Sequence, residues 1–158
     1  MDAQAMHNEI RVMVAADVDD ELVTAMQHLV TQLSSSAPTP GVQELREIVG
    51  SECTTLLIAR DHAQVNRIVG SLTLAVFRIP TGVRAWIEDV IVDANARGKG
   101  VGEALSREAL RIAQSRGART IELTSRSSRE AANRLYRRLG FIPRDTNVYR
   151  YSASTNAG

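Results

Sequence analysis

The chain has 158 residues, of which 44% are hydrophobic and 23% charged, with a formal net charge of +1. This length suits one domain that buries about two-thirds of its surface. The chain has no run of 18 apolar residues and only one cysteine, so we expect neither a membrane span nor an internal disulfide.

The first half of the chain predicts a strand, two helices and two further strands, in that order. Apolar residues alternate within residues 10–15, and they recur three or four positions apart in the first helix. The expected bounds are 10–15 for the first strand, 18–33 and 42–49 for the helices, and 54–60 and 67–79 for the next two strands. Asp17 is expected to cap the first helix, and Gly70 to mark a bulge in the last strand.

The second half predicts a central strand, a long helix, a strand, a second helix and two short strands. The expected bounds are 83–92, 100–116, 118–125, 127–138, 141–143 and 147–151. Ser127 and Glu130 have the spacing of a capping box for the second of these helices. Residues 152–158 are expected to be a disordered tail. No repeat or linker divides residues 1–158, so one domain is expected.

Residues 97–102 read Arg-Gly-Lys-Gly-Val-Gly and join the central strand to the long helix. The free N–H groups of a helix's first turn and the positive end of its dipole attract anions. Glycine allows an anion to approach those amides closely and adopts positive φ without strain. The stretch therefore predicts a ligand with a phosphate or pyrophosphate, held by main-chain nitrogens. The alternative is that the glycines only form a tight turn.

Two common glycine motifs do not match this stretch. The dinucleotide motif requires Gly-x-Gly-x-x-Gly and an acidic residue after a second strand, whereas Gly98, Gly100 and Gly102 are spaced Gly-x-Gly-x-Gly. The Walker motif requires Ser or Thr after Gly-Lys, and here another glycine follows Lys99.

The pattern that does match is Arg-x-x-Gly-x-Gly, formed by Arg97, Gly100 and Gly102. It resembles the cofactor-binding motif of the GNAT superfamily of acyl-CoA-dependent N-acetyltransferases. A second block, residues 127–141, is similar to the family motif that ends Leu-Tyr-x-x-x-Gly-Phe. The two motifs and the strand between them span residues 83–143, which makes the resemblance much more specific than either motif alone.

The resemblance implies an α/β domain of the α+β type. Its sheet would be mixed and mostly antiparallel, with six to seven strands, about four flanking helices and a splayed pair of central strands. It also implies an N-acetyltransferase that uses acetyl-CoA as co-substrate, without a metal. The acetyl group would pass to a primary amine of a small molecule or peptide by direct attack in a ternary complex. Many relatives pair, which leaves a homodimer open.

Charge is distributed unevenly along the chain. Residues 1–96 hold 6 Arg against 13 Asp and Glu, and residues 97–158 hold 13 Arg and Lys against 5 acidic residues. A basic half is one sign of nucleic-acid binding, but this half has no dense basic tract and no aromatic platform, so no nucleic-acid partner is expected. An anionic cofactor is the simpler explanation, and the acidic half favours an amine substrate.

Two further features concern compartment and metals. Residues 1–4 lack the charged and apolar segments of a secretory signal, and the lone Cys53 suits a reducing compartment, so a cytoplasmic protein is expected. The three histidines lack the spacing of metal ligands, and no metal site is expected.

The resemblance assigns the cofactor to a set of residues on three elements. The loop amides would bind the pyrophosphate, with Arg97 and Lys99 supplying positive charge. The central strand would pair with the pantetheine arm, and its Val90 amide would face the thioester oxygen. The expected cofactor-binding residues are Val90, Ile91, Val92, Arg97, Gly98, Lys99, Gly100, Val101, Gly102, Arg129 and Asn133.

The last helix departs from the family pattern at one position. Many members carry an Asn seven residues before the motif tyrosine, and here Arg129 occupies that position. Arg129 would either bind a phosphate or cap the helix. Asn133 lies one turn before Tyr136 on a similar face and is a second candidate for cofactor contact.

Two carboxylates, Glu88 and Asp89, interrupt the apolar central strand. A carboxylate partly withdrawn from water suits general-base work, so Glu88 is expected to deprotonate the acceptor amine, directly or through a water. The alternatives are that Glu88 pairs with an arginine or only orients the substrate. Asp89 faces the opposite side of a regular strand, unless a bulge intervenes. The Glu-Asp pair also resembles glucosamine-6-phosphate N-acetyltransferases within the superfamily.

Tyr136 occupies the family's general-acid position. A phenol with a pKa of about 10 stays protonated at neutral pH and donates to a thiolate whose conjugate acid has a pKa near 8.5. The alternative is a buried tyrosine with a packing role. Two other functions are compatible with the motifs: a CoA-binding module or sensor without turnover, and a nucleotide-binding protein.

Overall fold

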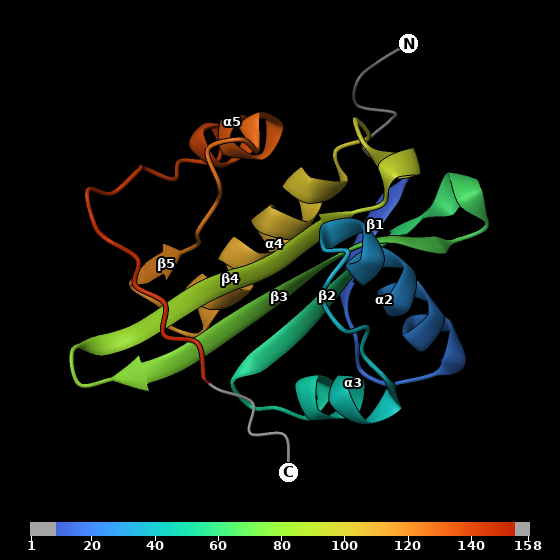
Figure 1. Ribbon diagram of the computed structural model, residues 1–158, viewed down its shortest axis with the longest axis horizontal. Helices are drawn as coiled ribbons and strands as arrows, with labels where there is room; N and C mark the ends of the chain where they lie inside the picture. Colours follow the sequence, from blue (N-terminus) through green and yellow to red (C-terminus); the bar gives the residue numbers. More distant parts are fainter. Residues whose placement is uncertain (1–8, 154–158) are drawn as a thin grey trace.

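The computed structural model describes residues 9–153 and is shown in Figure 1. Within this range five strands form one sheet, in the spatial order β1-β2-β3-β4-β5. They are β1 (Ile10–Val14), β2 (Thr54–Asp61), β3 (Arg67–Ile79), β4 (Gly82–Val92) and β5 (Thr120–Glu122). The first four pair antiparallel and β5 runs parallel to β4, so the sheet is mixed, as predicted.

The described part of the chain has four α-helices and two 3₁₀ turns. They are α2 (Asp20–Leu33), α3 (Val42–Val49), α4 (Val101–Ser115), α5 (Glu130–Arg138), η1 (His62–Gln64) and η2 (Ala94–Ala96). Helices α2 and α3 lie on one face of the sheet and α4 lies on the other, with α5 beside α4 (Figure 1). No helix among residues 9–153 is both long and apolar enough to cross a membrane.

The strands bury side chains on both faces of the sheet. In β2, Leu57 and Ala59 pack in the core beneath α4, whereas Leu56 and Ile58 pack in a second core beneath α2 and α3. Successive side chains of a strand point to opposite faces, so a strand covered on both sides has a continuous apolar run. This explains why β2 reads Leu-Leu-Ile-Ala without polar alternation.

The predicted six to seven strands are wrong for residues 9–153, where the sheet has five. Residues 141–143 and 147–151 have no regular secondary structure, and β5 has 3 residues instead of the predicted span 118–125. The pattern of 147–151 is typical of a strand, but this segment is exposed along its whole length. A strand pattern alone does not form a strand, since β propensity acts through neighbouring strands.

Two predicted helix caps are also wrong. Asp19, and not Asp17, caps α2, and its carboxylate accepts a hydrogen bond of 2.8 Å from the Leu22 amide. The capping box of Ser127 and Glu130 does not form, because α5 begins at Glu130 and Arg129 is its N-cap without a side-chain bond. Several acidic or hydroxyl residues precede each helix, and the chain's approach to the helix selects among them.

The predicted bulge lies beside Gly70. Ala59 pairs with Gly70 and Arg60 with Ile68, which leaves Val69 as the extra residue of β3. A Cβ on Gly70 would lie 2.7 Å from Cγ1 of Val101 and 3.0 Å from a backbone oxygen of β4. Glycine is therefore what allows the first residue of α4 to contact the sheet.

We expect Gly70→Ala to destabilise the protein by about 1–3 kcal/mol, because the added methyl overpacks the contact between β3 and α4. Gly41→Ala is the matched control, since the atom 3.0 Å from its added Cβ is the end of the flexible Glu44 side chain. Denaturant unfolding of the three proteins measures the difference. Equal midpoints for Gly70→Ala and the wild type would contradict the packing argument.

Candidate active site

Strand β4 separates from β5 after a short paired stretch. The pairs are Arg84 with Thr120, Ala85 with Ile121 and Trp86 with Glu122. From Glu88 to Val92, β4 still pairs with β3, but in the described part of the chain it has no strand on its other side. The N–H and C=O groups on that side form an open sheet edge, which can bind an extended ligand as an added strand does.

A bulge lies within this open stretch. Thr73 of β3 pairs with Glu88 and Ser71 with Ile91, so Asp89 and Val90 together oppose one residue. Asp89 has a φ of 48°, a left-handed conformation that aspartate adopts more readily than most residues. The bulge reverses the alternation, because Ile87 packs beneath α4 whereas Ile91 packs beneath α2.

Glu88 lies on the sheet face that carries α2 and α3, opposite to Ile87. It is exposed, so the predicted partial burial of this carboxylate is wrong. Its hydrogen-bond partner is the indole N–H of Trp86 and not an arginine. The indole therefore fixes the direction of the Glu88 carboxylate on an open face.

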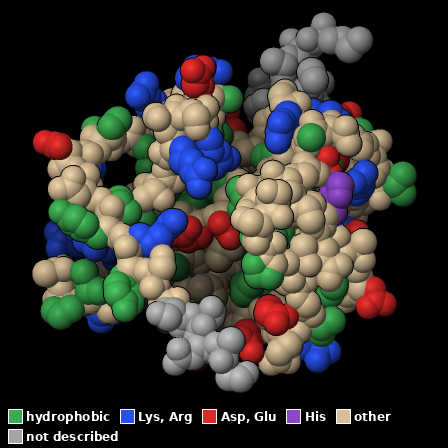
Figure 2. All heavy atoms as spheres, viewed as in Figure 1, with side chains coloured by type: hydrophobic (Ala, Val, Ile, Leu, Met, Phe, Trp, Pro, Cys, Tyr) green, Lys and Arg blue, Asp and Glu red, His purple; other side chains and the backbone are tan. Residues whose placement is uncertain are grey.

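A second carboxylate borders Trp86. Glu122 is the β5 partner of Trp86, and Arg144 from the segment after α5 lies 3.1 Å from the Glu122 carboxylate. In Figure 2, acidic side chains lie in a hollow at the centre of the displayed face. Acidic side chains in a hollow suit an amine-bearing ligand.

The glycine loop forms as predicted between η2 and α4. Gly98 and Gly100 have φ values of 79° and 80°, in the left-handed region that favours glycine. Gly100 is the N-cap of α4 and offers no side chain to its first-turn amides. A Cβ on Gly98 would meet no atom within 4 Å, so this side of the loop is open. The positive end of α4 is therefore accessible to an anion.

The two basic residues of the loop have different surroundings. Arg97 is exposed. The Lys99 ammonium lies 3.2 Å from the Asp61 carboxylate at the end of β2, and Asp61 is fully buried. The structure thus ties Lys99 to the sheet and leaves Arg97 on the surface.

Helix α5 brings the second motif beside the loop. A Cβ on Gly102 would lie 3.4 Å from Leu135 of α5 and 3.6 Å from Val92 of β4, so these three residues adjoin. Arg138 of α5 also lies 2.9 Å from the Glu103 carboxylate of α4. The contacts place α5 against the start of α4.

Tyr136 is buried in this arrangement, with 6% of its surface exposed. Its ring packs edge-on against Phe141, with 5.8 Å between the ring centroids. Burial raises the pKa of the Tyr136 phenol above its ordinary value, and the positive charge of Arg129 lowers it by a smaller amount. The phenol therefore carries its proton throughout the neutral range.

The other two cofactor-binding candidates near α5, Asn133 and Arg129, differ in their contacts. Asn133 donates a hydrogen bond of 2.9 Å to the Arg126 carbonyl and so closes the turn before α5. Arg129 is exposed at the start of the helix. The side-chain amide of Asn133 is thus already engaged within the chain.

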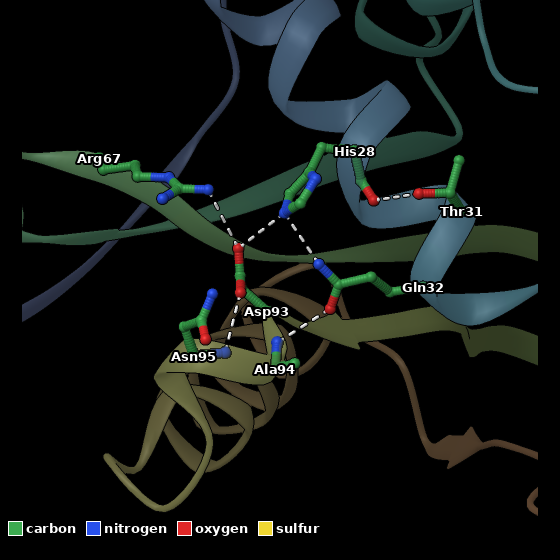
Figure 3. Close-up of polar contacts among 7 residues, drawn as sticks. All are labelled: His28, Thr31, Gln32, Arg67, Asp93, Ala94 and Asn95. Atoms are coloured by element: carbon green, nitrogen blue, oxygen red, sulfur yellow. Dashed lines mark hydrogen bonds and ion pairs between the residues drawn. The ribbon is translucent and has the colours of Figure 1, made fainter.

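Asp93 forms a polar cluster that was not predicted from the sequence (Figure 3). Its carboxylate lies 3.0 Å from His28 Nε2 and 3.3 Å from the Arg67 guanidinium, and it also accepts from the Asn95 amide at 2.9 Å. Gln32 accepts a hydrogen bond of 2.8 Å from the Ala94 amide. The cluster joins α2 and the start of β3 to η2, at the entry to the glycine loop.

The only local sequence signal for this cluster is an Asp two residues before Asn95, a spacing typical of an Asx turn. Burial by itself raises the pKa of Asp93. The hydrogen bonds from Asn95 and His28 and the charges of His28 and Arg67 outweigh that effect, so the pKa lies below its ordinary value. No group of three His, Cys, Asp or Glu residues within 9–153 is arranged to hold a metal ion.

A family model described as "Acetyltransferase (GNAT) family" matches residues 16–141. The chain belongs to the GNAT acetyltransferase family.

A relative with similar length supports this assignment. Glucosamine 6-phosphate N-acetyltransferase of Trypanosoma brucei brucei is 33% identical over 138 residues, which cover 84% of this chain and 88% of the relative.

Solved structures show the same fold. A Trypanosoma brucei acetyltransferase has a TM-score of 0.73 at 24% identity, with 90% of this chain and 99% of that chain covered. An aminoglycoside acetyltransferase from an uncultured soil metagenomic sample, in complex with sisomicin, has a TM-score of 0.80 at 18% identity, with 94% and 99% covered. At these identities the two structures support the fold alone.

We expect Asp93→Asn to destabilise the protein at pH 7 by about 1–3 kcal/mol, because His28 and Arg67 lose their charged partner. A carboxyl whose pKa is lowered by folding stabilises the fold above its unfolded pKa, and this contribution disappears as the pH falls through the folded value. The difference from the wild type should therefore shrink below about pH 3.9.

Urea unfolding at pH 7 and at pH 3 provides the measurement, with Asp17→Asn as the control for an exposed aspartate. If the difference in free energy of unfolding between the wild type and Asp93→Asn were larger at pH 3 than at pH 7, the expected direction of the pH dependence would be wrong.

Proposed function

We propose that the protein is an acetyl-CoA-dependent N-acetyltransferase that acetylates a primary amine by direct attack in a ternary complex. The observation that carries this proposal is the open edge of β4 from Glu88 to Val92, which leads through η2 into the glycine loop at the start of α4. The open edge suits the amide groups of pantetheine, and the helix start suits the pyrophosphate.

In this proposal the main chain holds most of the cofactor. The amides of Gly98, Gly100, Val101 and Gly102 donate to the pyrophosphate, and the exposed Arg97 adds a guanidinium that fits phosphate oxygens. The edge groups of Val90, Ile91 and Val92 pair with pantetheine. Arg129 is a further candidate for a phosphate contact because it is exposed at the start of α5.

The proposed reaction needs three groups around the thioester. Glu88 takes a proton from the acceptor ammonium, directly or through a water, and the amine nitrogen then attacks the thioester carbon. The Val90 amide stabilises the oxyanion that forms. When the C–S bond breaks, Tyr136 donates its proton to the thiolate, and the second proton that the attacking nitrogen loses returns to the phenol through water. Holding both substrates together accounts for about 7–11 kcal/mol of the barrier.

The acceptor in this proposal is a small-molecule amine or a peptide amine. The exposed Glu88 carboxylate, which accepts from the Trp86 indole N–H, supports a cationic group at that position. Glucosamine 6-phosphate and aminoglycosides are natural first candidates because they appear in the names of the relatives.

Acetyl-CoA consumption across an amine panel tests the proposal. The panel contains glucosamine 6-phosphate, aminoglycosides, polyamines, amino acids and peptides, with Glu88→Gln as the variant that removes the base. Turnover that is reduced strongly in Glu88→Gln would support the proposal. CoA binding without turnover on any amine would replace it with a CoA-binding sensor.

We further propose that residues 1–158 act as one acetyltransferase domain in the cytoplasm. A homodimer also stays a prediction. Ile142, Val148, Tyr149 and Tyr151 are exposed apolar side chains after α5, of the kind that such a dimer would bury.

We expect Tyr136→Phe to lower kcat by about 10²- to 10⁴-fold with little change in CoA affinity, because the thiolate loses its proton donor. Tyr149→Phe, at an exposed tyrosine, is the matched control. Steady-state kinetics and calorimetry with CoA separate the two effects. An unchanged kcat would remove Tyr136 from the mechanism.

Gly100→Asp should abolish CoA binding, since the new side chain enters the phosphate site with a like charge. Gly117→Asp is a close control because Gly117 has nearly the same φ, 83° against 80°, and lies beyond the other end of α4. Both variants add one negative charge at a residue with a left-handed φ. If both bind CoA equally well in calorimetry, the loop does not hold the phosphate.

A further inference from the structure

The end of the β2–β3 hairpin lies against the glycine loop. Asp61, the last residue of β2, and Arg67, the first of β3, are cross-strand partners. The five residues between them form η1 and a tight turn in which Val65 and Asn66 have positive φ. The hairpin end thus presents one acidic and one basic side chain next to each other.

Each of these two residues forms an ion pair with the chain around the glycine loop. The Arg67 guanidinium lies 3.3 Å from Asp93, and the Asp61 carboxylate lies 3.2 Å from the Lys99 ammonium. Asp93 stands where β4 ends, and Lys99 stands between the two left-handed glycines. We refer to Asp61, Arg67, Asp93 and Lys99 as the hairpin–loop quartet.

The two carboxylates of the quartet are built alike. Asp61 caps η1, with one oxygen accepting from the Ala63 amide at 3.0 Å, and Asp93 caps η2, with one oxygen accepting from the Asn95 amide at 2.9 Å. The second oxygen of each binds the cation of the opposite segment. Each aspartate therefore fixes its own turn and its distance from the other segment.

The burial of Asp61 and Asp93 makes their ion pairs necessary for stability. The side chains of Asp61 and Asp93 are 1% and 2% exposed, whereas those of Lys99 and Arg67 are 35% and 50% exposed. A buried carboxylate without a cation is unfavourable, so each aspartate holds its partner in place. The loop backbone between Asp93 and Gly100 is thereby fastened near both ends.

The sign of the charges argues against a direct role in binding phosphate. Two buried carboxylates close to a pyrophosphate weaken its binding by Coulomb repulsion. The Asp61 carboxylate also neutralises Lys99, which stands within the loop. If Asp61 strengthens phosphate binding, it does so by fixing the conformation of the glycine loop and not through its charge.

We propose that Asp61 and the rest of the quartet are positioning residues, which hold the loop in its phosphate-binding conformation before the cofactor arrives. The inference rests on the proposed function, because it assumes that CoA is the ligand of the loop. Preorganised donors lose less entropy and keep their alignment, so the quartet sets the affinity for the pyrophosphate part of CoA.

Asp61→Asn is the decisive variant because the two explanations predict opposite signs. If Lys99 contacted the phosphates directly, removing the Asp61 charge would free the ammonium and tighten CoA binding. If the quartet positions the loop, the same change weakens CoA binding by roughly 10- to 100-fold. Calorimetry with CoA, on the wild type and the variant, gives the sign.

Four further proteins complete the design. Lys99→Gln should weaken CoA binding to a similar extent, and the double variant should be no worse than either single one, because both remove the same contact. Lys99→Arg should retain the affinity. Arg111→Gln, which breaks an exposed pair on α4, is the control for loss of a surface ion pair.

A shortened substrate separates positioning from general damage to the fold. S-Acetylpantetheine lacks the pyrophosphate, so Asp61→Asn should raise the KM for acetyl-CoA but not the KM for S-acetylpantetheine. Equal increases in the two KM values, or tighter CoA binding by Asp61→Asn, would overturn the inference. Failure of the wild type to bind CoA would instead overturn the proposed function.

Discussion

The separation of β4 from β5 is the constraint on which the rest of the site depends. Because the two strands pair only as far as Trp86 and Glu122, the backbone beyond Glu88 keeps free hydrogen-bonding groups at an accessible position. An isolated edge of this kind invites unwanted pairing with other chains. Here the bulge at Asp89 twists the edge, and helix α5, which packs on α4, lies nearby. The edge is therefore open to a narrow ligand and poorly suited to another sheet.

Close packing behind the loop completes this arrangement. Gly70 lets Val101 contact the sheet, and Gly102 leaves room for Leu135 of α5. Gly70 in β3 and Gly102 in the motif are needed because a side chain would block close packing. Gly98 and Gly100 are needed for their left-handed backbone conformation. One glycine-rich motif thus combines two physical requirements, which explains why the spacing of its glycines carries more information than their number.

Local patterns predicted the features that arise within short stretches of chain. The α2 to α5 helices, the left-handed glycines and the start of α4 follow from periodicity and glycine turns over a few residues, whereas the caps of α2 and α5 were predicted at the wrong residues. The quartet was missed because Asp61 and Lys99 are 38 positions apart, and each alone reads as a surface charge. The strands predicted at 141–143 and 147–151 failed for the related reason that a strand needs a neighbour. Burial of Glu88 was also inferred from its apolar neighbours, whereas those neighbours lie on both faces of β4.

The exposure of Glu88 bears on the base role that we propose for this residue. A carboxylate in water is a weak base for an ammonium group, because hydration stabilises both charges. In the proposed reaction, an acceptor amine beside Glu88 and pantetheine on the strand edge would displace water from this carboxylate, which the Trp86 indole already directs. Desolvation raises the proton affinity of a carboxylate and lowers that of an ammonium, so proton transfer becomes easier only when both ligands are present. In a ternary-complex mechanism, a base that is exposed in the free protein is thus coupled to the presence of its substrates.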